Sequence, residues 1–214
     1  MGFGNFSVWW YVINEVTECL QDRDYGMEDT VKKGFSIRDI AQIGLMVALI
    51  EVSKFALSAI PNVELTSFWL IMFTLYFGWR IVVVVPVFIL IEGAMYGVQL
   101  WWVMYLYSWP LLVFVTWLFR KKDSALLYAT ISGIFGLCFG ALCTIPFFFV
   151  GLSSGGISSA VSTAGSWWIS GLPWDVVHCA GNFVIMLVLY KPVGHAMKWV
   201  VNRETGNNGS GGLL

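Results

Sequence analysis

The chain has 214 residues, of which 58% are hydrophobic and only 12% are charged, and its formal net charge is −1. Soluble domains carry about 25% charged residues, so this composition excludes an ordinary soluble globular protein. It gives no reason to expect a nucleic-acid partner, and a lipid bilayer is the first partner to consider.

The N-terminal extension, residues 1–35, precedes the first long apolar run. It combines a short apolar stretch with an acidic stretch from Asn14 to Asp29. Such a segment can form an amphipathic helix at the membrane interface, or it can be a partly ordered tail. The sequence leaves both interpretations open.

Six apolar segments follow, and a helix needs about 20 apolar residues to cross the hydrocarbon of a bilayer. The sequence therefore predicts an all-α membrane protein with six transmembrane helices. The segments cover approximately residues 37–59, 65–79, 81–98, 103–119, 125–149 and 167–190. The Gly-rich tail at 196–214 is expected to be cytoplasmic and largely disordered.

The positive charges follow the segments. Eleven of the twelve Lys and Arg residues lie before or at the start of the first segment, in alternate connections or after the last segment, and the exception is Lys54. Cytoplasmic loops collect Lys and Arg, so both termini are predicted to be cytoplasmic. The connections near 60–64, 99–102 and 150–166 are then the outer ones, and the last is expected to be a flexible loop.

Small residues mark two of the segments as helix-packing surfaces. In the first segment they allow either docking to a partner subunit or packing within the chain. In the fifth segment packing within the chain is the better interpretation. The residues are Ala41, Gly44 and Ala48 in the first segment, and Gly133, Gly136, Gly140 and Ala141 in the fifth.

Ionisable side chains inside the segments are costly unless they are paired or hydrated. Glu51 and Lys54 are three residues apart on one helix face, so they are expected either to pair with each other or to edge a hydrated cavity. Glu92, near the outer end of the third segment, is either a structural acid or part of a cavity wall.

The outer connections are rich in aromatic residues. Six of the twelve tryptophans lie in or beside them, interleaved with Asn62, Gln99, Ser108 and Ser170. An interfacial aromatic belt is the simple explanation. The neighbouring neutral hydrogen-bonding groups favour a ligand cavity instead.

A polar stripe begins the last segment. Asp175, His178 and Asn182 fall at i, i+3 and i+7, and therefore on one helix face. In a membrane such a stripe must face protein or water, which favours a cavity wall.

No catalytic or metal-binding constellation is evident. Gly151-x-Ser153-x-Gly155 matches a nucleophile motif, but that motif requires a strand-to-helix turn. No His, Cys and carboxylate cluster has the spacing of metal ligands. The chain is therefore not expected to be an enzyme, to bind metal or to hold a covalent cofactor.

Two motifs resemble the substrate-binding S components of energy-coupling factor importers. They are Ile60-Pro-Asn-Val-Glu64 and the run from Gly171 to Phe183, Gly-Leu-Pro-Trp-Asp-Val-Val-His-Cys-Ala-Gly-Asn-Phe. The resemblance covers about residues 36–195 and implies a six-helix domain in a bacterial cell membrane. Its partners would be a transmembrane coupling subunit and two cytoplasmic ATPase subunits. Docking would fall to Ala41, Gly44 and Ala48, although Gly44 replaces the family's usual Ala.

The resemblance implies a vitamin or a metal ion as the transported ligand. The outer side has no Lys or Arg to clamp a dianion, and His-rich metal ligation is absent. Cobalamin is the expected substrate, with thiamine or pyridoxine as the alternative and a non-transport structural membrane protein as a further one. The expected binding residues are Asn62, Glu64, Glu92, Tyr96, Gln99, Trp101, Trp102, Tyr105, Trp109, Trp167, Trp168, Trp174, Asp175, His178 and Asn182.

Overall fold

The computed structural model describes the backbone of residues 35–209 and side chains to Arg203, so the N-terminal extension lies outside the described residues. This part of the chain is helical and contains no strand. Its elements are α2 (Ile37–Leu57), α3 (Thr66–Phe77), the short 3₁₀ helix η1 (Gly78–Arg80), α4 (Ile81–Tyr96), α5 (Leu100–Leu118) and α6 (Ala125–Gly209).

Four helical stretches within the described residues are long and apolar enough to cross a membrane: Ile37–Leu57, Thr66–Tyr96, Leu100–Leu118 and Ala125–Arg203. The second joins α3 to α4 through η1, where Gly78 has φ 55°. The chain is therefore compatible with a membrane protein. The count of six spans and the orientation of the termini stay predictions.

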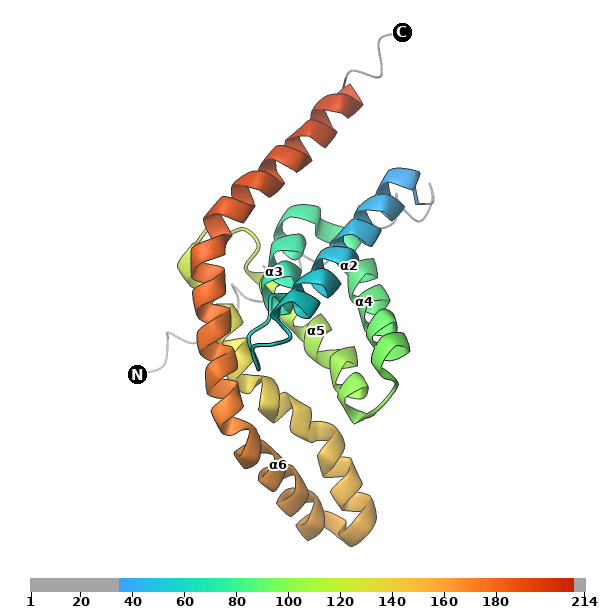
Figure 1. Cartoon of the computed structure of the whole chain (residues 1–214), viewed down its shortest axis with the longest axis vertical. Coiled ribbons are helices and arrows are strands. Elements are labelled where there is room, and N and C mark those ends of the chain that lie inside the picture. Colours follow the sequence, from blue (N-terminus) through green and yellow to red (C-terminus); the bar gives the residue numbers. More distant parts are fainter. Residues whose placement is uncertain (1–34, 210–214) are drawn as a thin grey trace, which may run out of the picture.

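Helix α6 folds back on itself at two glycines (Figure 1). Gly156 has φ 73°, a value that glycine adopts without the steric penalty of a side chain. We call residues 125–154 the first arm and residues 157–209 the second arm. The prediction of a flexible loop at 150–166 is wrong, because all of this segment except the turn at Gly155–Gly156 is helical. The Gly and Ser residues of this segment have a low helix propensity, and packing between the two arms compensates for it.

Glycines of the first arm form the seam between the two arms. A Cβ on Gly136 would lie 2.9 Å from the backbone of His178, and one on Gly151 would lie 2.7 Å from Cα of Ala160. A Cβ on Gly133 would lie 3.3 Å from Cβ of Phe183. As the residue number rises on one arm it falls on the other, so the arms are antiparallel. The predicted internal packing of this glycine face is confirmed.

Helix α3 lies at the centre of the bundle. It packs against α2, α5 and α6, and its residues Phe68, Leu70, Ile71, Met72 and Phe73 are almost completely buried. A short helix that is apolar on all sides is expected in such a position, because it has no polar face to direct outward.

One end of the bundle carries most of the described Lys and Arg residues, and we call it the basic end. Ser36 and Asp39 form a capping box at the start of α2, and Arg80 from the α3–α4 turn bonds Asp39 at 2.8 Å. Tyr76, just before that turn, contacts Gly194 of the second arm. The start of α2 and the end of α6 therefore belong to the same end (Figure 1).

The second arm continues past the membrane-compatible stretch to Gly209. This differs from the disordered tail expected from residue 196. Lys198 bonds Asp123 at 3.3 Å, and Arg203 lies 3.9 Å from the centroid of the Trp199 ring. These contacts stabilise the start of the extension, and residues 210–214 lie outside the described part.

Asp123 gives a testable pH dependence. The Tyr190 hydroxyl donates to it at 2.9 Å, and this bond, followed by that from Lys198, lowers the pKa of Asp123 below its usual value. A lowered folded-state pKa adds stability above the unfolded pKa of about 3.9, and this stability is lost as the pH falls through the folded value. We expect wild type to lose more melting temperature than Asp123→Asn on acidification from about pH 5 to about pH 3. The difference should be small, because the Asp123 side chain is 71% exposed. Parallel curves of melting temperature against pH for the two proteins would contradict the prediction.

Candidate functional site

A cavity of about 480 Å³ lies at the end of the bundle opposite the basic end, which we call the cavity end. The last turn of α2, the α2–α3 connection, the adjoining ends of α4 and α5 and both arms of α6 form its walls. Eight of the predicted binding residues line it: Asn62, Glu64, Glu92, Tyr96, Trp101, Tyr105, Asp175 and His178. Sequence reasoning missed a further eight: Lys54, Phe55, Leu57, Ser58, Ile60, Pro61, Val63 and Phe139.

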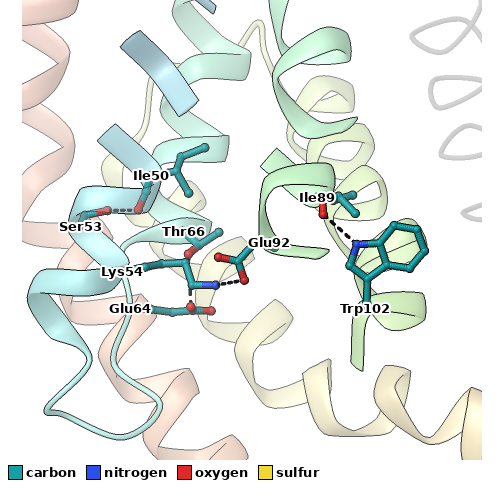
Figure 2. A network of polar contacts seen from close by, with 8 residues as sticks. All are labelled: Ile50, Ser53, Lys54, Glu64, Thr66, Ile89, Glu92 and Trp102. Atoms are coloured by element: carbon teal, nitrogen blue, oxygen red, sulfur yellow. Dashed lines mark hydrogen bonds and ion pairs between the residues drawn. The ribbon is translucent and has the colours of Figure 1, made fainter. Parts of the chain in front are cut away.

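The ion pair in the wall joins Lys54 to Glu92, not to Glu51. Figure 2 shows the Lys54 side chain reaching from α2 to α4, where Nζ lies 2.6 Å from Oε2 of Glu92. The expected pair between Glu51 and Lys54 is therefore not formed, whereas the alternative position at the edge of a cavity holds for Lys54. The inter-helix partner is favoured because Glu92 is only 3% exposed, and a buried carboxylate without a cation is costly.

Glu64 comes from the connection between α2 and α3. The Thr66 hydroxyl donates to it at 3.2 Å (Figure 2), and its other oxygen lies 3.7 Å from Nε2 of His178. Asn62, on the same connection, has φ 55°, a conformation that asparagine tolerates better than most residues. This turn directs the connection back over the cavity.

Asp175 depends on the seam for its position. Its Oδ1 accepts the backbone N–H of Gly140 at 3.0 Å, and a Cβ on Gly140 would collide with the carboxylate. Its Oδ2 has no hydrogen-bond partner. Asp175 can approach the first arm only because residue 140 is a glycine.

Three buried polar atoms of cavity-lining residues have no hydrogen-bond partner. They are Oε1 of Glu92, Oδ2 of Asp175 and Nε2 of His178. Buried polar groups are nearly always satisfied, so these three atoms are available to bind a ligand or water in the cavity. Two of the three are carboxylate oxygens, which only accept hydrogen bonds and so favour a ligand that donates them.

Aromatic rings complete the walls. Trp101 and Tyr105 meet edge to face with ring centroids 5.3 Å apart, and both line the cavity. Trp109 lies beneath them, fully buried, 5.3 Å from Tyr105 and 5.6 Å from Phe139. Trp109 therefore supports the wall and does not line it.

Six further predicted binding residues lie away from the cavity. Trp102 donates to the carbonyl oxygen of Ile89 at 2.8 Å, because it faces away from the side of α5 that carries Trp101 and Tyr105. Gln99 is exposed, and Trp167 stacks on Phe147 with centroids 3.8 Å apart. Together with the exposed Trp168 and Trp174, Trp167 fits an interfacial belt better than a ligand cavity. The sixth is Asn182.

Asn182 links three helical pieces in the core. Its Nδ2 lies 3.2 Å from Oγ of Ser67 on α3 and 3.3 Å from the carbonyl oxygen of Ser132 on the first arm. We expect Asn182→Ala to destabilise the protein by about 1–3 kcal/mol, because it removes these bonds and leaves buried groups unsatisfied. Ligand affinity should change little. Lost binding at an unchanged melting temperature would instead place Asn182 in the binding site.

The cavity is formally acidic. Glu64, Glu92 and Asp175 supply three carboxylates against the single ammonium of Lys54. No group of three or more His, Cys, Asp or Glu side chains in the described residues could hold a metal ion. Carboxylates and aromatic faces that line one cavity can together bind an organic cation.

The predicted docking face on α2 is open. Ala41, Gly44 and Ala48 are exposed, and a Cβ on Gly44 would meet nothing within 4 Å. No packing within the described part of the chain covers this face. The alternative of internal packing is therefore not seen here.

Comparisons with protein-family models, with curated proteins and with solved structures gave no match. Function is therefore inferred from the chemistry of the cavity and from the motifs of the sequence.

Proposed function

We propose that this chain is the substrate-binding membrane subunit of a vitamin importer of the energy-coupling factor type. We further propose that it binds a small organic cation of the thiamine class. The observation that carries the proposal is the acidic, aromatic cavity, in which three carboxylates face one ammonium. Unpartnered oxygens of Glu92 and Asp175 add acceptors for N–H donors of the ligand.

The volume of the cavity favours the smaller of the candidate vitamins. Pockets of about 300–1,000 Å³ enclose most of the surface of a drug-sized ligand, and this cavity of about 480 Å³ falls in the lower part of that range. Thiamine and pyridoxine are of this size. Cobalamin is much larger, and most of its surface would remain outside.

The positions of the charges suit uptake from outside the cell. Lys and Arg collect on the cytoplasmic side of membrane proteins, so the cavity end, opposite the basic end, would face outward. The exposed Ala41, Gly44 and Ala48 would then form the contact with the transmembrane coupling subunit, which would carry two ATPase subunits. Hydrolysis of ATP would be carried out by those partners.

Calorimetric titration of the purified protein with thiamine, pyridoxine and cobalamin tests the proposal. We expect thiamine to bind with a Kd below about 1 µM and to compete with pyridoxine for one site. Cobalamin binding alone would keep the importer and replace the substrate. No binding of any of the three, without co-purifying coupling and ATPase subunits, would overturn the proposal and favour a membrane protein with a structural role.

A further inference from the structure

Lys54 lies in surroundings that would suit a free organic cation. Its Nζ is 2.6 Å from the Glu92 carboxylate and 5.4 Å from the centroids of both the Phe88 and Tyr105 rings. Cations bind aromatic faces at distances up to about 6 Å, and a nearby carboxylate strengthens such a site. We call Glu92, Phe88 and Tyr105 the cation cage.

The cation cage belongs to the cavity. Lys54, Glu92 and Tyr105 all line the cavity, and Phe88 lies behind them, fully buried. Lys54 reaches the cage on a flexible four-carbon stem, and its side chain keeps 19% of its surface exposed. The ammonium could therefore leave the cage without movement of a helix.

A second carboxylate lies within reach of the ammonium. Glu51 is three residues before Lys54 on α2, a spacing that places side chains next to each other. Its Oε1 is buried without a hydrogen-bond partner. Glu51 also lies within hydrogen-bonding reach of Glu92, whose like charge it opposes, and it attracts Lys54. Lys54 can therefore pair across to Glu92 or along its own helix to Glu51.

We propose that Lys54 is a built-in surrogate for the substrate. In the empty cavity its ammonium occupies the cation cage, and a cationic substrate takes its place there while Lys54 turns to Glu51. This inference rests on the proposed function for the identity of the substrate, whereas the existence of the cage does not. Exchange of one cation for another keeps Glu92 paired in both states, so the buried carboxylate is never left alone.

Chemical rescue tests the cage without any vitamin. In Lys54→Ala the cage loses its cation, and n-propylammonium chloride should bind there and raise the melting temperature. We expect Lys54→Ala to respond at a concentration of n-propylammonium at least about tenfold lower than wild type does. In wild type the Lys54 ammonium occupies the cage most of the time, and the apparent affinity of a ligand falls with the fraction of protein whose site is free. The double variant Lys54→Ala/Glu92→Gln should not respond. Equal responses of Lys54→Ala and wild type would overturn the proposal.

Thiamine affinity tests the exchange. Lys54→Met keeps most of the apolar stem and removes the charge, so it also serves if the alanine variant does not fold. We expect it to bind thiamine at least about tenfold more tightly than wild type. Glu51→Gln should bind thiamine more weakly than wild type. The same change made in the Lys54→Met variant should not alter thiamine affinity. Lys198→Met, which breaks the Asp123 pair at the basic end, is the matched control and should leave affinity unchanged.

The outcomes separate the two proposals. Unchanged or weaker thiamine binding by Lys54→Met, with wild type still binding thiamine, would overturn the exchange and leave the proposed function standing. Rescue by n-propylammonium without thiamine binding to wild type or Lys54→Met would support the cage and overturn thiamine as the substrate.

Discussion

Replacing Gly136 with alanine is expected to destabilise the protein by about 1–3 kcal/mol, the usual cost of inserting a methyl group into a tightly packed contact. The new Cβ would lie 2.9 Å from C and O of His178, which are backbone atoms and cannot rotate away. The two arms of α6 would have to separate. Thermal unfolding of the purified variant in detergent measures the loss.

Gly165→Ala is the matched control for the seam. Residue 165 is a helical glycine of the second arm, and a Cβ there would meet nothing within 4 Å. Alanine is favoured over glycine in a helix by about 1 kcal/mol, so this variant should be as stable as wild type or more stable. If Gly136→Ala behaved like Gly165→Ala, the close approach of the arms would be wrong.

Replacing Asp175 with asparagine should weaken binding of the cationic ligand by about 30-fold or more. Truncating one partner of a buried charged pair costs about 2–5 kcal/mol, and 1.4 kcal/mol is a factor of about ten. The amide oxygen can still accept the N–H of Gly140, the bond that Oδ1 accepts at 3.0 Å. The fold should therefore survive, and calorimetry with thiamine measures the change.

Asp123→Asn provides the same chemical change at the basic end, where Asp123 bonds Tyr190 and Lys198. It should leave ligand affinity unaltered. A second comparison is Asp175→Ala, which also removes the acceptor for Gly140 and should lower the melting temperature further. Equal ligand affinity in wild type and Asp175→Asn would remove Asp175 from the binding site.

Sequence periodicity and charge were sufficient for much of the helical architecture. The ends of α2, α4 and α5 lie within three residues of the predicted segments, because long apolar runs flanked by polar residues leave few alternatives. The prediction that the polar stripe on the last segment forms a cavity wall holds for two of its three residues. Asp175 and His178 line the cavity, whereas Asn182, one turn further, lies in the core.

The remainder depended on tertiary contacts that local sequence does not encode. Residues 150–166 have the composition of a loop, yet they are helical where the two arms pair, with Gly151 close to Ala160. The choice of Glu92 over Glu51 as the partner of Lys54 depends on how close α4 comes to α2. Trp101 and Trp102 are adjacent in sequence, and only the rotation of α5 decides which of them faces the cavity.

The Lys54–Glu92 pair also has a consequence for the biogenesis of the protein. The partners are separated by 38 positions in the chain, so if α2 inserts into a bilayer as it is made, Glu51 on its own helix is the carboxylate that can pair with Lys54 before Glu92 has been synthesised. Until α4 arrives, Lys54 would pair with Glu51 or extend its stem to the lipid headgroups, and the pair with Glu92 would form only afterwards. The first of these helices, α2, would therefore reach its final arrangement in the lipid only when α4 is present.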